Sequence, residues 1–171
     1  MMPSGYREVG FSNNIIVGVA DMKVSNNLDS VLVTYSLGSC IGIAIHDPVA
    51  RVGGLLHFML PESELDRQKA QEKPYMFADT GIPKLFKSAY ELGAKKHRMR
   101  VVIAGGSQVM DQHGFFNIGK RNQMAVRKIF HRNNIMIDGC DVGGTSNRTL
   151  RLVVRSGLTS LKISGINDNA L

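Results

Sequence analysis

The fold is decided by residues 31–60, which read VLVTYSLGSCIGIAIHDPVARVGGLLHFML. Short runs rich in Val, Ile and Leu are separated here by two turn signals, Gly38-Ser39 and Asp47-Pro48. This alternation is typical of consecutive β-strands. Pro61 follows the last run, and proline cannot continue a central strand. Three strands are therefore predicted: Val31–Leu37, Cys40–His46 and Val52–Leu60.

Helical and strand patterns follow one another on either side of this stretch. Apolar residues recur at helical spacing within residues 80–92 and 121–133, so both segments are predicted to be helices, and Gly93 is predicted to end the first. Residues 62–74 and 114–119 are predicted to be loops. Further strands are predicted at Asn14–Ala20, Val101–Gly105, Ile135–Ile137, Leu150–Val154 and Leu158–Ile163.

The order of these elements is strands, helix, strand, helix, strands. It predicts a mixed α/β protein of the α+β kind, in which layers of strand and helix are packed together without the regular alternation of a doubly wound fold. A length of 171 residues suits one core, and no repeat or linker interrupts the chain. Residues 1–13 are predicted to be a flexible N-terminal arm, and residues 14–171 a single domain.

The composition restricts the function classes. Hydrophobic residues make up 43% of the chain, but no apolar run is long enough to span a bilayer, and no secretory signal precedes the first strand. A cytoplasmic protein without membrane insertion is expected. The net charge of +7 favours an acidic partner. Nucleic acid is not favoured, because the basic residues are scattered and tryptophan, the best base-stacking residue, is absent.

Two cysteines must be explained separately, because Cys40 and Cys140 lie 100 residues apart without metal-site spacing. Cys40 follows Gly38-Ser39, where a sharp backbone turn can aim amide groups at a carbonyl oxygen above the sulfur. Gly38, Ser39 and Cys40 are therefore candidates for an oxyanion hole. Cys40 as a small apolar residue packed at a strand start remains the alternative. Cys140 lies between two aspartates, which disfavour a thiolate.

His57 interrupts the apolar run Val52–Leu60, where an imidazole needs a reason to be. If its strand neighbours that of Cys40, His57 could act as the base for the thiol, and Thr34, six residues before Cys40, could orient the imidazole. A core histidine bonded to the backbone and an ordinary strand threonine are the alternatives. The other histidines compete for the role of base, and the strongest competitor is His113 in a predicted exposed loop: His46, His97, His113 and His131.

These motifs resemble the CheD family of chemotaxis proteins. The resemblance rests on Leu37-Gly38-Ser39-Cys40-Ile41-Gly42-Ile43 and on Gly54-Leu55-Leu56-His57-Phe58-Met59-Leu60-Pro61, and it continues through Ile118-Gly119-Lys120-Arg121-Asn122 and Asp141-Val142-Gly143-Gly144. It implies a layered sandwich of mixed β-sheets with outer helices, similar to the deamidating cytotoxic necrotizing factor toxins. It also implies a protein-glutamine glutaminase that deamidates chemoreceptor glutamines.

The resemblance assigns the catalytic roles to Cys40, His57 and Thr34, with no metal or organic cofactor. The implied partners are the cytoplasmic helices of chemoreceptors, as substrate, and a CheC-like phosphatase. A non-catalytic adaptor for such a phosphatase is the alternative function, and methylesterase activity is attributed to some members. Two positions depart from the family pattern. Lys120 stands where a glutamate is usual, and Asn147 replaces a glycine, a change that asparagine's tolerance of left-handed geometry should accommodate.

Overall fold

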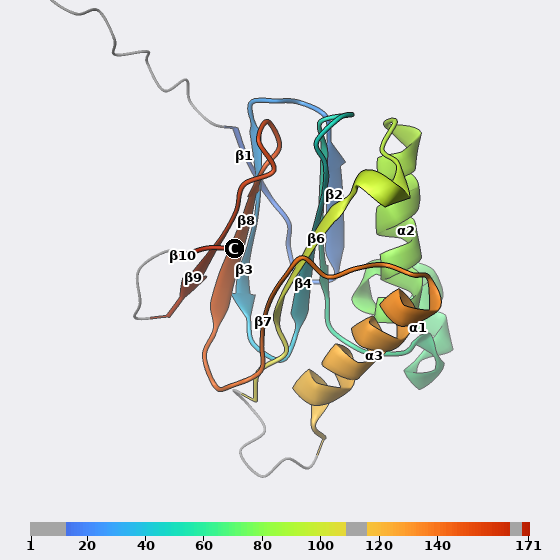
Figure 1. Ribbon diagram of the computed structural model, residues 1–171. Helices are drawn as coiled ribbons and strands as arrows, with labels where there is room; N and C mark the ends of the chain where they lie inside the picture. The colour runs from blue at the N-terminus through green and yellow to red at the C-terminus, as the bar shows by residue number, and fades with distance from the viewer. Residues whose placement is uncertain (1–12, 109–115, 165–168) are drawn as a thin grey trace, which may run out of the picture.

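The computed structural model describes residues 13–108, 116–164 and 169–171. Its strands form two five-stranded mixed sheets that lie face to face, with helices outside the second sheet (Figure 1). The first sheet has the order β1-β3-β8-β9-β10: β1 Asn13–Ile16, β3 Ser30–Leu37, β8 Arg148–Val153, β9 Thr159–Ile163 and β10 Asn169–Ala170. The second has the order β2-β5-β4-β6-β7: β2 Asp21–Ser25, β5 Val52–Phe58, β4 Ile41–Asp47, β6 Arg100–Gly105 and β7 Gly139–Val142.

Two long helices cover the outer face of the second sheet (Figure 1), α2 at Ala78–Glu91 and α3 at Ile118–Arg132. Both were predicted, and Gly93 ends α2 with a φ of 94°, a left-handed backbone that suits glycine. The mixed α+β fold and the layered sandwich with outer helices are therefore confirmed. The likeness to the necrotizing factor toxins stays a prediction. Among the described residues, no helix has the length and hydrophobicity needed to cross a membrane.

The central strand β4 is buried on both faces, which explains why its sequence is a nearly continuous apolar run. Its odd-numbered residues, Ile41, Ile43 and Ile45, belong to the core between the second sheet and the helices. Ala44 points the other way, into the core between the two sheets. A Cβ on Gly42 would meet Leu37 of the first sheet, so this position also faces the inter-sheet core. The sheets and helices thus enclose two separate apolar cores.

The predicted loop at residues 62–74 is wrong in part, because it contains the short helix α1, Arg67–Glu72, flanked by the 3-10 turns Ser63–Leu65 and Pro74–Met76. Asp66 caps α1 by accepting a hydrogen bond from the amide of Lys69 at 2.9 Å. Ala70 is the one buried residue of α1. A helix stabilised by its cap and without an apolar stripe leaves no periodic signal in the sequence.

Two strand predictions also need correction. β2 was not predicted, because only Met22 in Asp21–Ser25 is buried and the strand is held by antiparallel pairing with β5. The strand predicted at Ile135–Ile137 lies instead at β7, beside β6 in parallel. Ile135 and Ile137 are apolar because they pack on the helix-side core. The predicted N-terminal arm lies outside the described residues apart from Asn13, and the single-domain assignment stays a prediction.

Candidate active site

The turn that carries Cys40 is the link between the two sheets. β3 ends at Leu37 in the first sheet and β4 begins at Ile41 in the second, so Gly38-Ser39-Cys40 crosses from one layer to the other. The register of β3 against β8 shifts just before the turn, between Thr34 and Leu37. Cys40 is half-buried and packs against the inter-sheet core. Its thiol is therefore placed at the margin of the sandwich, between the apolar interior and solvent.

His57 lies on β5, the neighbour of β4. The antiparallel register places His57 opposite Gly42, two residues after Cys40. Residues directly opposite each other on paired strands point to the same face of the sheet. A side chain at Gly42 would point toward the first sheet, so the side chain of His57 points there too. Cys40 packs into the same inter-sheet layer. Cys40 immediately precedes β4 and is diagonal to His57 in this register, and a diagonal pair across antiparallel strands is within reach of long side chains.

Thr34 reaches His57 from the opposite sheet. Its Oγ1 is 2.7 Å from Nδ1 of His57 and 2.8 Å from the carbonyl oxygen of Val17, to which it donates. A hydroxyl has one hydrogen, and because the carbonyl can only accept, that hydrogen goes to Val17. The Nδ1 of His57 must then be the protonated nitrogen, donating to Thr34. This arrangement selects the neutral tautomer whose free lone pair is on Nε2.

The Nε2 atom of His57 is buried and has no hydrogen-bond partner within the described part of the chain. A buried polar atom without a partner lowers stability, and such atoms often mark a catalytic position. Burial lowers the pKa of His57 to about 4, which keeps the imidazole neutral at physiological pH. His57 therefore presents an unprotonated nitrogen that can accept a proton.

Burial also raises the pKa of the Cys40 thiol, and the residue's own backbone amide acts more weakly in the opposite direction. A raised thiol pKa and a lowered imidazole pKa both disfavour a thiolate–imidazolium pair at rest. Both groups are therefore expected to be neutral at rest. In such a pair the thiol is activated by transfer of its proton to the base during attack.

The glycine pair Gly105-Gly106 holds the other side of the turn. The amide of Gly106 donates to the carbonyl oxygen of Cys40 at 2.8 Å. Gly105 has a φ of 111°, and a Cβ at that position would overlap the same oxygen. Close backbone approach and a positive φ are the two conditions that favour glycine, and position 105 meets both. Only glycine at position 105 allows the end of β6 to approach the Cys40 turn this closely.

A model of the family described as CheD chemotactic sensory transduction matches residues 59–163. The chain is 53% identical over 152 residues to the probable chemoreceptor glutamine deamidase CheD 1 of Syntrophus aciditrophicus, a match covering 89% of this chain and 95% of the relative. The chain belongs to the CheD family. The probable chemoreceptor glutamine deamidase CheD of Solibacter usitatus is 50% identical over 88% of this chain and 89% of its own length.

The family model and the alignment with a relative cover different parts of the candidate site. The matched residues 59–163 begin just after His57. The alignment with the Syntrophus relative is longer. It covers 152 of the 171 residues, so it must include at least part of the segment from Thr34 to His57.

Among solved structures, the Neisseria meningitidis protein NMB0706 has a TM-score of 0.43 at 10% identity, and the match covers 78% of this chain and 63% of that protein.

The other polar candidates are placed elsewhere. His46 is near the far end of β4, where its buried Nε2 lies 2.8 Å from the carbonyl oxygen of Val154. His97 and His131 are exposed, on a 3-10 turn and in the last turn of α3. His113 lies outside the described residues. Cys140 is exposed on the edge strand β7.

The two residues that depart from the family pattern are both exposed at the surface. Lys120 is exposed in the first turn of α3, beside an open hollow that Gly106 and Gly144 also line. Asn147 does not adopt the left-handed backbone considered for it, since the positive φ values fall at Gly143 and Gly144. Its carbonyl oxygen accepts a hydrogen bond from the amide of Ser164 at 3.1 Å. The turn before β8 therefore needs no glycine at position 147.

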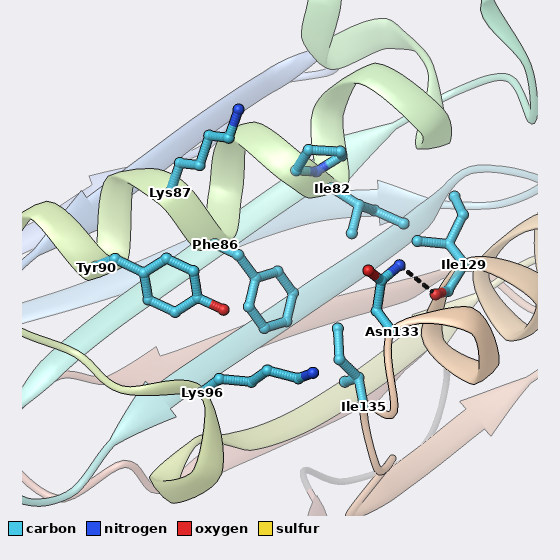
Figure 2. Close-up of a pocket in the computed structure, with 9 residues that line it drawn as sticks. Ile82, Phe86, Lys87, Tyr90, Lys96, Ile129, Asn133 and Ile135 are labelled. Carbon is cyan, nitrogen blue, oxygen red and sulfur yellow. Dashed lines mark hydrogen bonds between the residues drawn. The ribbon is translucent and has the colours of Figure 1, made fainter.

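A separate apolar hollow lies between α2 and α3 (Figure 2). Its lining joins apolar side chains of both helices with two lysines: Ile82, Pro83, Phe86, Lys87, Tyr90, Lys96, Ile129, Asn133 and Ile135. It contains no cysteine, histidine or carboxylate, so it offers no nucleophile with a base. Among the described residues no cluster of His, Cys, Asp and Glu could hold a metal ion. The Cys40 turn is therefore the best candidate for the active site.

Proposed function

We propose that this CheD-family protein hydrolyses the side-chain amide of chemoreceptor glutamines to glutamate, with Cys40 as nucleophile, His57 as base and Thr34 as the group that orients His57. The observation that carries the proposal is the pairing of Thr34 Oγ1 with His57 Nδ1, which leaves a buried Nε2 that has no partner among the described residues and lies on the inter-sheet side where Cys40 packs. The two relatives are named as probable chemoreceptor glutamine deamidases, which supports the substrate class.

The reaction follows from the two resting protonation states. As the Cys40 sulfur attacks the carboxamide carbon, its proton passes to Nε2 of His57, and the carbonyl oxygen becomes an oxyanion. The same proton then moves from Nε2 to the departing nitrogen, ammonia leaves, and a thioester remains on Cys40. Water attacks the thioester while giving a proton to Nε2, and return of that proton to sulfur releases glutamate and the free thiol. The turn amides of Ser39 and Cys40 are the proposed donors to the oxyanion.

The charge of the protein supports an acidic or anionic docking surface on the receptor. The chain carries 21 basic against 14 acidic side chains, and long-range attraction between oppositely charged surfaces raises the rate of encounter. Raising ionic strength should therefore slow deamidation through kcat/KM while leaving kcat nearly constant. A rate that does not depend on salt would remove this part of the proposal.

The decisive experiment uses a purified chemoreceptor cytoplasmic fragment, with ammonia release and mass spectrometry of the glutamine-containing peptides as readouts. Cys40→Ala and His57→Ala should each abolish ammonia release while keeping the fold. Cys140→Ala is the matched control, because that exposed thiol lies away from the turn, and it should retain activity. Full deamidation by Cys40→Ala would refute the mechanism.

Capture of a CheC-like phosphatase by a wild-type protein that turns over no receptor would instead favour the adaptor. Methanol release from a methylated fragment tests methylesterase activity.

A further inference from the structure

All three carbonyl oxygens of the Cys40 turn are held by groups from other elements. The Gly38 oxygen accepts from the amide of Ser107 at 2.9 Å and lies 2.8 Å from its hydroxyl, whose single hydrogen is shared with the carbonyl oxygen of Ser146 at 3.0 Å. The Ser39 oxygen accepts from Nδ2 of Asn122 at 2.9 Å. The Cys40 oxygen accepts from the amide of Gly106 at 2.8 Å. Three successive peptide planes are thus oriented by contacts from outside the turn.

The orientation of these carbonyls determines where the turn amides point. In a planar trans peptide the C=O of one residue and the N–H of the next point in opposite directions. With the Gly38 and Ser39 oxygens turned toward Ser107 and Asn122, the N–H groups of Ser39 and Cys40 are turned away from those residues. Neither amide donates to a backbone carbonyl within the described residues, and the Cys40 amide interacts only with its own thiol. Two neighbouring donors are left available beside the sulfur, as stabilisation of an oxyanion requires.

Asn122 is the unusual member of this set, because it is a fully buried polar residue of α3. Its Nδ2 donates to Ser39 and also to the carbonyl oxygen of Met59 at 2.8 Å. Since both neighbours can only accept, the amide nitrogen must face them. Its Oδ1 is buried without a partner among the described residues, which lowers stability relative to a fully paired group. The contact with Met59, two residues after His57, ties the strand of the base to the turn of the nucleophile.

We propose that Asn122 and Ser107 are positioning residues, which orient the Ser39 and Cys40 amides as the oxyanion hole. The proposal rests on the proposed function, since it requires attack by Cys40 on a carbonyl. Asn122 is expected to contribute more than Ser107 to the orientation of the turn. The Gly38 oxygen keeps the Ser107 backbone amide when that side chain is removed, whereas Ser39 has no second donor among the described residues.

The test compares Asn122→Ala and Ser107→Ala with a matched control, Asn133→Ala, in a Cys140→Ser background. Asn133 lies just beyond α3 and donates a side-chain amide hydrogen bond to a backbone carbonyl far along the helix from the turn. Two rates are measured: deamidation of a receptor fragment, and alkylation of Cys40 by iodoacetamide. Alkylation is a displacement at a saturated carbon and forms no oxyanion, so it reports on the thiol and its base alone.

Asn122→Ala should lower kcat by roughly ten- to a hundredfold with KM little changed, because a misplaced donor is lost mainly in the transition state. Ser107→Ala should have a smaller effect, and Asn133→Ala none. The alkylation rate and its pH profile should stay as in the parent. If Asn122→Ala fails to fold, Asn122→Ser, which can reach at most one of the two carbonyls, takes its place with the same expectation.

Two results would overturn the inference. One is an unchanged kcat in the folded Asn122 variant. The other is an equal fall in deamidation and alkylation, which would mean that the side chain only keeps the turn ordered. Failure of the proposed function gives a different signature, since deamidation would then either survive Cys40→Ala or be absent from the wild-type protein as well. The two hypotheses are therefore separable within one set of variants.

Discussion

Replacing Thr34 by valine tests the tautomer argument most directly, because valine has nearly the same shape and lacks the hydroxyl. The substitution removes the donor to the Val17 oxygen and the acceptor of the His57 Nδ1 proton. Thr34 and His57 are fully buried, and Val17 is nearly so, so water cannot replace either bond. Thr34→Ser is the matched control, since it keeps the hydroxyl and loses only a methyl group.

The magnitude follows from the two groups left without a partner. Each buried polar group without its hydrogen bond costs about 1–3 kcal/mol, so Thr34→Val should lower the free energy of unfolding by roughly 2–4 kcal/mol after the apolar gain. Thr34→Ser should lose about 1 kcal/mol, the value of one buried methyl group. Without Thr34 the imidazole can carry its proton on Nε2 and can turn from Cys40. A well-placed base contributes about 10²–10⁴ in rate, so a ten- to hundredfold fall in kcat is expected.

The assay pairs urea unfolding with steady-state ammonia release from a receptor fragment at pH 7. Stability and catalysis are then read on the same two proteins. The expected pattern is that Thr34→Val loses both stability and kcat, whereas Thr34→Ser loses some stability and keeps kcat near the wild-type value. Equal kcat in the two variants would refute the role of the hydroxyl in selecting the tautomer, whatever the stabilities show.

Three further predictions concern the turn, the core and pH. Gly105→Ala should sharply reduce deamidation and lower the melting temperature, because its Cβ would overlap the Cys40 oxygen; a fully active, folded variant contradicts this. Asp47→Ala should destabilise the protein by about 1–3 kcal/mol in urea unfolding, since it leaves the partly buried Arg98 and three partly buried amides unpaired; a loss well below 1 kcal/mol, the size of a surface pair, would argue against it. For His57, the folded pKa of about 4 lies below the unfolded value of 6.5, so its stabilising contribution is complete above pH 6.5 and is lost as pH falls toward 4. Between pH 7 and pH 4, the free energy of unfolding should fall by about 3 kcal/mol more in wild type than in His57→Asn. Parallel curves of stability against pH would exclude the depressed pKa.

The strands around Cys40 could be predicted because local features of the sequence mark each strand and its ends. Strongly buried strands such as β4 and β5 are apolar along most of their length, and Gly38-Ser39 and Asp47-Pro48 mark their ends. The two long helices were predicted for a similar reason, since each has one apolar face. The segments missed or misplaced, β2, α1 and β7, have few buried side chains and are held by pairing or a cap.

Local sequence patterns identify the residues that could do chemistry here: a cysteine after a glycine turn, a histidine in an apolar strand, and a threonine six residues before the cysteine. How these residues meet depends on the folded chain, because Thr34 and His57 belong to different sheets, and a hydrogen bond between sheets has no trace in local spacing. The same is true of Asn122, which looks like an ordinary polar helix residue until the fold buries it against Ser39 and Met59. Local patterns report backbone preference and burial, whereas the direction of a proton or a peptide plane depends on partners brought from far along the chain.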